Sequence, residues 1–201
     1  MDRRVTVVVA ASFIAVAARM SLVQFLGIYF VHRAGIDVTT VGLAFLCENI
    51  ARGLAAPFFG TLSDRLGRRP LLIASSLVTA VVLPAFLLVT GPATLLAWSL
   101  LLGTAGAINI PVSSALLLDL APPERRQSVL ALNYTVMSVA YTLGVIPAGY
   151  IAERGYGILA AASAAGYALV AALYLAALRG PLPLERAAPA PSPPRSRSSF
   201  R

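Results

Sequence analysis

The amino-acid sequence predicts an all-α membrane protein with six transmembrane helices. Hydrophobic residues make up 58% of the 201 positions and charged residues only 12%, a composition that favours a bilayer over water as the main solvent. Crossing roughly 30 Å of hydrocarbon takes about 20 apolar residues. Six windows meet this requirement, at residues 5–31, 38–62, 71–89, 93–118, 128–152 and 157–178.

The arginines predict how these windows are oriented. If the windows alternate in direction, only Arg33 and Arg154 fall on one side of the membrane. The other side receives Arg3, Arg4, Arg65, Arg68, Arg69, Arg125, Arg126, Arg179, Arg186, Arg195, Arg197 and Arg201. Positively charged loops mark the cytoplasmic face. We therefore expect a multi-pass protein of the cell membrane with both termini on the cytoplasmic side. The net charge of +8 then reflects topology, and we expect no nucleic-acid partner.

The composition divides the chain into two parts. Residues 1–179 contain all six windows and are expected to form one helical bundle. Residues 180–201 are rich in proline, serine, alanine and arginine, with almost nothing to bury. We expect this second part to be a disordered cytoplasmic tail or a linker between bundles.

An internal repeat relates the second window to the fifth. The hexapeptide GTLSDR at 60–65 is similar to GYIAER at 149–154, and each follows a proline, Pro57 or Pro147. The match pairs windows one to three with windows four to six. Because three is odd, the second copy crosses the membrane in the opposite direction. The expected architecture is a 3+3 inverted repeat, which is typical of secondary transporters.

The stretch GTLSDRLGRRP, residues 60–70, interrupts the apolar sequence after the second window. Its marked positions are Gly60, Leu62, Asp64, Arg65, Gly67, Arg68 and Arg69. This pattern resembles the loop signature between the second and third helices of the major facilitator superfamily (MFS). Residues 100–126 and 143–150 are similar to the family's fourth and fifth helices. A complete member has twelve helices, so the resemblance implies the N-terminal bundle of an MFS fold.

The resemblance also implies a function. It indicates secondary active transport of a small solute by alternating access, with efflux as one direction that the resemblance allows. The chain would be a half or a truncated form of such a transporter. A second six-helix bundle would be the partner, as a C-terminal half, a separate chain or a second copy. Two departures from the family pattern count against antiport: Ser99 stands where an arginine is frequent, and Pro147 does not directly follow Gly144.

In the family the 60–70 loop acts as a gate that latches the cytoplasmic side. By resemblance, the gating residues are Gly60, Asp64, Arg65, Gly67, Arg68 and Arg69. Asp119, at the same membrane edge, is a candidate partner for Arg68 or Arg65. The alternative is that these arginines serve only as topology anchors.

Three charged residues lie inside apolar windows, where a central charge costs about 2.5–3.5 kcal/mol. They are Arg19, Glu48 and Arg52. An ion pair between Arg19 and Glu48 is geometrically allowed across antiparallel helices, and Asn49 extends the polar face of the second window. We predict a role for these four residues in the translocation path or in proton coupling. The alternative is a structural bridge between Glu48 and Arg52, which are four residues apart.

Windows four and five carry further candidates. Asn109, Tyr134 and Tyr141 follow helical spacing and could contact substrate, whereas Gly103 and Gly144 are expected to let helices pack closely. No set of nucleophile, base or metal ligands is assembled, so we expect no enzyme, no metal and no cofactor. The alternative function is a non-transporting six-helix membrane protein, such as a gene remnant or an accessory subunit.

Overall fold

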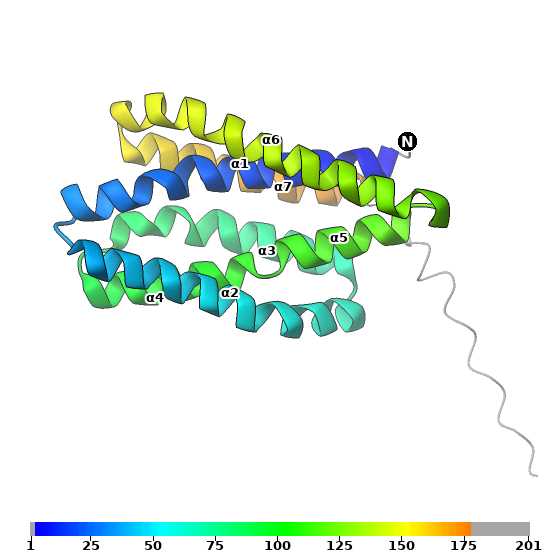
Figure 1. Ribbon diagram of the computed structural model, residues 1–201, viewed down its shortest axis with the longest axis horizontal. Helices are drawn as coiled ribbons and strands as arrows, with labels where there is room; N and C mark the ends of the chain where they lie inside the picture. Colours follow the sequence, from blue (N-terminus) through cyan, green and yellow to red (C-terminus); the bar gives the residue numbers. More distant parts are fainter. Residues whose placement is uncertain (1–2, 178–201) are drawn as a thin grey trace, which may run out of the picture.

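The computed structural model describes residues 3–177, which form a bundle of helices that run along one axis (Figure 1). The segment 180–201, predicted to be a disordered tail, lies outside the described residues. The elements are α1 (Arg3–His32), α2 (Val38–Leu66), α3 (Arg68–Val82), η1 (Pro84–Leu88), α4 (Pro92–Gly106), α5 (Asn109–Leu120), η2 (Pro123–Arg125), α6 (Arg126–Arg154) and α7 (Tyr156–Ala177).

Five helical segments of the described chain are long and apolar enough to cross a membrane. They are Arg3–His32, Arg68–Leu88, Pro92–Leu120, Pro123–Arg154 and Tyr156–Ala177. Helix α2 is 29 residues long but is not among them, because the polar cluster around Glu48, Asn49 and Arg52 lowers its mean hydropathy. Five of the six predicted spans are therefore confirmed as candidates, and the crossing by α2 stays a prediction.

Successive spans run in opposite directions along the bundle, with α4 and α5 together forming the fourth span. Figure 1 shows that the N-terminal end of α1, the turn between α2 and α3 and the connection from α5 to α6 share one end of the molecule. The turn between α1 and α2 and the end of α6 lie at the opposite end. The arginine-rich loops thus gather at one end of the bundle, as the alternation of windows predicts.

Two groups of helices build the bundle. Helices α1, α6 and α7 pack on one another, α2 packs mainly on α4, and α3 joins the groups through α7 and α4. Helices α1 and α2 touch only sparsely. The space between the two groups is where the candidate site lies.

Prolines interrupt the third and fourth spans. Pro84 has no N–H, so the α-helix ends before it and continues as the 3-10 helix η1. The indole N–H of Trp98 donates to the carbonyl of Val82 at 2.7 Å and satisfies an acceptor at this irregular point. A buried carbonyl left without a donor would be costly.

The fourth span is two helices and not the continuous helix that window 93–118 predicts. Helix α4 ends at Gly106 and α5 begins at Asn109. Pro111 explains the break, because it cannot donate to the carbonyl of Ala107 and its ring collides with that group in a regular helix. The break lies midway along the bundle, where a continuous helix would otherwise pass.

Glycines set the closest helix crossings. A Cβ atom on Gly103 would collide with the backbone carbonyl of Glu48, and one on Gly144 would lie 2.8 Å from the carbonyl oxygen of Ala17. These contacts join α4 to α2 and α6 to α1. The predicted packing role of Gly103 and Gly144 is confirmed.

Gly103→Ala should separate α4 from α2 at the level of Glu48. We expect a loss of about 1–3 kcal/mol in the free energy of unfolding, the usual effect of overpacking, measured by chemical unfolding in detergent micelles. Gly42→Ala is the matched control on α2, because nothing lies within 4 Å of a Cβ there. Equal stability of the two variants would contradict the close crossing.

Candidate functional site

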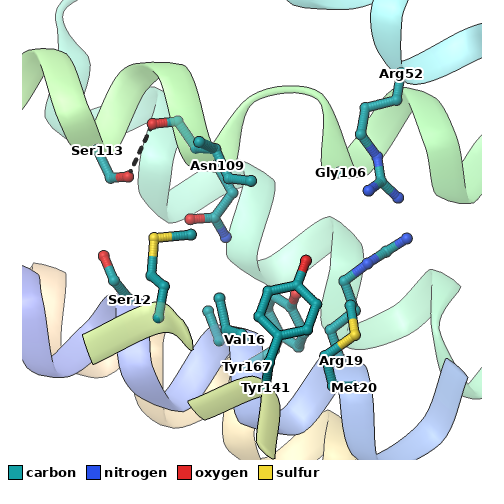
Figure 2. A pocket seen from close by; sticks show the side chains of 13 residues that line it. Ser12, Val16, Arg19, Met20, Arg52, Gly106, Asn109, Ser113, Tyr141 and Tyr167 are labelled. Atoms are coloured by element: carbon teal, nitrogen blue, oxygen red, sulfur yellow. Dashed lines mark hydrogen bonds between the residues drawn. The ribbon is translucent and has the colours of Figure 1, made fainter. Parts of the chain in front are cut away.

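A cavity of about 40 Å³ lies between the two helix groups. Residues of six helices line it, and Figure 2 shows most of their side chains directed toward the same space. The lining residues are Ser12, Ala15, Val16, Arg19 and Met20 of α1, Arg52 of α2, Gly106 of α4, Asn109, Ile110 and Ser113 of α5 with Met137 and Tyr141 of α6, and Tyr167 of α7. The break between α4 and α5 forms part of its wall.

A charge cluster borders this cavity. Glu48 is 2% exposed and Arg19 is 9% exposed. The Nη2 atoms of Arg19 and Arg52 both donate to Oε1 of Glu48. The interhelical pair that the sequence allows and the bridge within α2 are therefore present together.

Helix lengths bring the three charges to one level. Arg19 lies thirteen residues before the end of α1 and Glu48 ten residues after the start of α2, so both lie about 15–20 Å from the turn that joins the helices. Asp37 fixes the start of α2 by accepting a hydrogen bond from the N–H of Thr39 at 2.9 Å. The long side chain of Arg19 then spans the gap between α1 and α2.

The guanidinium groups keep unused donors. Nε and Nη1 of Arg19 and Nε of Arg52 are buried and have no hydrogen-bond partner among the described residues. Gly106 gives these groups room, because a Cβ on it would lie 3.5 Å from Arg19 Nη1 and from Nε and Nη2 of Arg52. Figure 2 shows both guanidinium groups directed toward the space beside Gly106.

Two predicted path residues do not line the cavity. Asn49 is exposed, and its side-chain amide donates to the carbonyl of Phe45 at 2.8 Å. The residue after Glu48 is rotated by about 100° around the helix, which turns Asn49 away from the cluster. Tyr134 is 52% exposed and lies about two helical turns from Tyr141. Neither residue is on the wall of this cavity, and their role in the translocation path stays a prediction.

The 60–70 loop makes a second polar cluster at one end of the bundle. Gly67 has φ +88°, a conformation that favours glycine, and it separates α2 from α3. Arg68 donates from Nη1 to Oδ2 of Asp119 and to the carbonyl of Ala115 on α5. Asp64 is 3.8 Å from Arg68. The sequence predicts either Arg68 or Arg65 as the partner of Asp119, and in the structure the partner is Arg68.

Other residues of the loop differ in their surroundings. Arg69 donates to the carbonyl of Leu175 on α7 at 3.3 Å, whereas Arg65 is exposed. A Cβ on Gly60 would have nothing within 4 Å. Gly67 therefore forms the turn between two helices, whereas no neighbouring backbone comes close to Gly60 within the described bundle.

Comparison with known protein families settles what kind of molecule carries these two clusters. A family model described as Major Facilitator Superfamily matches residues 8–201. The chain belongs to the Major Facilitator Superfamily. It is thus a multi-pass membrane protein of a transporter family and not an enzyme.

Curated relatives of this MFS chain are transporters from bacteria. A "Na(+), Li(+), K(+)/H(+) antiporter" of Planococcus maritimus is 28% identical over 125 residues, which cover 60% of this chain and 29% of the antiporter. The "Staphyloferrin B transporter" of Staphylococcus aureus (strain NCTC 8325 / PS 47) is 29% identical over 147 residues, which cover 71% of this chain and 35% of that protein. The chain spans about a third of the length of these relatives.

A solved structure confirms the fold. The crystal structure of the nucleoside transporter NupG matches with a TM-score of 0.72 at 17% identity. The match covers 95% of this chain and 47% of the NupG chain. At this identity the likeness concerns the fold alone, and the described bundle has the arrangement of about half an MFS transporter.

Some cavity residues of this MFS bundle escape sequence reasoning. Ser12, Ser113 and Tyr167 carry no charge, so no insertion penalty draws attention to them in an apolar window. Tyr167 lies in the alanine-rich stretch 160–172, whose small residues are typical of a packing surface. Gly166 does pack closely, since a Cβ on it would lie 2.8 Å from the Cβ of Ala18, while the tyrosine beside it reaches the cavity.

Asp119→Ala should destabilise the bundle more than Asp64→Ala. Asp119 is the partly buried acceptor of Arg68, and losing a hydrogen bond to a charged group costs about 1.5–3 kcal/mol. Asp64 has a side chain that is 69% exposed, and such surface pairs contribute at most about 1 kcal/mol. Unfolding midpoints in detergent micelles would measure both, and a larger loss at Asp64 would contradict the geometry.

Proposed function

We propose that this chain forms one six-helix bundle of a secondary active transporter, which moves a small solute by alternating access. The observation that carries the proposal is the buried charge cluster beside the cavity, at the break in the fourth span. Ionisable groups within membrane spans mark solute or ion paths. Broken helices line such paths in secondary transporters. Membership of the MFS supports the same conclusion.

The helix pairings support a 3+3 inverted repeat. Exchanging spans one, two and three with four, five and six turns the α1–α6 contact into the α4–α2 contact, and both are among the largest in the bundle. Each has a close glycine crossing, at Gly144 on α6 and at Gly103 on α4. The α3–α7 contact maps onto itself. We propose that α2 crosses the membrane as the counterpart of α6.

The exposed surface supports a second bundle as partner. Tyr141 lines the cavity but is 44% exposed, so the cavity borders an uncovered face. We propose that a second six-helix bundle covers this face, as a C-terminal half, a separate chain or a second copy. Asn49 and Tyr134, exposed on α2 and α6, then become candidates for the interface with that bundle. Lipid surrounds the remaining apolar surface.

We assign the gate to the loop that contains Asp64, Gly67 and Arg68. Its hydrogen bonds from Arg68 to Asp119 tie α3 to α5, so breaking them would free one end of the bundle. We place this end and both termini in the cytoplasm, because it carries most of the arginines.

Alternating access predicts that a cavity residue is reachable from both sides of the membrane in turn. Asn109→Cys in a Cys47→Ser background would be labelled with a membrane-impermeant maleimide in right-side-out and inside-out vesicles. We expect labelling in both, with a several-fold increase from the cytoplasmic side after Arg68→Gln. Val78→Cys is the control, since Val78 is 49% exposed on the apolar surface in the middle of the third span and should stay unlabelled.

Labelling of Asn109→Cys from one side only, unchanged by Arg68→Gln, would contradict transport. It would favour a six-helix membrane protein that moves nothing, such as an accessory subunit.

Crosslinking in the same membranes tests the second bundle, because the exposed face should join to another polypeptide.

A further inference from the structure

The charge cluster inside the bundle is not neutral. Arg19 and Arg52 contribute two positive charges, and Glu48 contributes one negative charge. The sum is one positive charge beside a cavity in the middle of the bundle. An uncompensated charge away from water is costly, so such a site favours an anion.

The cavity wall itself supplies no balancing charge. Among the lining residues in the described part of the chain, none is acidic. Its polar groups are hydroxyls and one amide, from Ser12, Ser113, Tyr141, Tyr167 and Asn109. These groups can donate hydrogen bonds to an anion, but they cannot neutralise a guanidinium group.

The arginines have donors left over for a ligand. Arg19 is more than nine-tenths buried, and its Nε and Nη1 lack a partner in the described bundle, as does Nε of Arg52. Glu48 meanwhile binds the Nη2 atom of each, which fixes both side chains in place. Preorganised guanidinium donors of this kind recognise oxyanions.

The break in the fourth span does not by itself favour either charge. Asn109, at the positive start of α5, lines the cavity, but so does Gly106 at the negative end of α4. The two arginines therefore carry the preference for an anion.

We propose that this cavity binds the carboxylate group of an anionic solute, through Arg19 and Arg52. The inference rests on the proposed transport function and names the substrate class. A carboxylate carries one negative charge and balances the cluster, whereas a phosphate monoester carries about −1.5 to −2 and would overshoot. The volume of about 40 Å³ has room for about three water-sized groups, which fits a head group. The rest of the solute extends past Tyr141 toward the uncovered face.

Benzoate and benzamide test the proposal, because they share a shape and differ in charge. The full chain in lipid nanodiscs would be titrated with each at constant ionic strength, and its thermal unfolding midpoint followed. We expect sodium benzoate to raise the midpoint in a saturable manner over sodium chloride, and benzamide to leave it unchanged. Equal effects of benzoate and benzamide, or of benzoate and chloride, would overturn the proposal. A larger shift with phenyl phosphate would overturn the choice of carboxylate.

Arg52→Gln locates the binding site. It leaves Arg19 and Glu48 as a neutral pair, so the bundle should still fold, and benzoate affinity should fall about tenfold or more. Arg52→Lys, which keeps the charge but loses the planar fork, should recover only part of the affinity. Arg33→Gln is the matched control. It removes an exposed positive charge in the turn between α1 and α2, away from the cavity, and should not change benzoate binding. Unchanged affinity in Arg52→Gln would overturn the proposal.

The outcomes separate this inference from the proposed function. Benzoate binding without two-sided labelling of Asn109→Cys would refute transport and keep the anion site. Two-sided labelling without benzoate binding would refute the anion site alone.

Discussion

The bundle depends on one carboxylate that serves two guanidinium groups. Two arginines in hydrocarbon cost about 2.5–3.5 kcal/mol each on insertion scales, a large part of the roughly 5–15 kcal/mol that stabilises a folded protein. Glu48 offsets this by accepting from both Arg19 and Arg52. Gly103 brings α4 directly onto the backbone of Glu48, which keeps the carboxylate away from lipid.

The break in the fourth span lies beside this charge cluster. Pro111 breaks the fourth span beside the arginines, and Gly106 leaves their guanidinium groups space. A continuous helix with a larger residue at 106 would fill the cavity. The proposed gate, in contrast, lies at one end of the bundle and acts through Arg68 and Asp119. The arrangement thus separates a candidate binding centre from a candidate gate within one bundle.

Sequence reasoning predicts the charged contacts better than the surfaces around them. The pairing of Arg19 with Glu48 follows from burial cost, because charges in apolar windows need partners. The exposure of Asn49 cannot be predicted in this way. Helical spacing places Asn49 on the same broad face of α2 as Glu48 and Arg52, but the cavity covers only part of that face. Nor can the break before Asn109 be predicted, because a proline such as Pro111 kinks some helices and ends others. Tyr167 is missed because an uncharged residue in an alanine-rich span resembles packing.

Stability of three variants tests most directly whether Glu48 pairs with both arginines. Glu48→Gln should cost about 3–5 kcal/mol in the free energy of unfolding, because it strands two buried charges. Arg19→Gln should cost much less, since Glu48 keeps Arg52. In the double variant Arg19→Gln/Glu48→Gln, removing one stranded charge should recover part of the loss, as measured by chemical unfolding in micelles. Simple addition of the two single losses would contradict a shared carboxylate at the centre of the bundle.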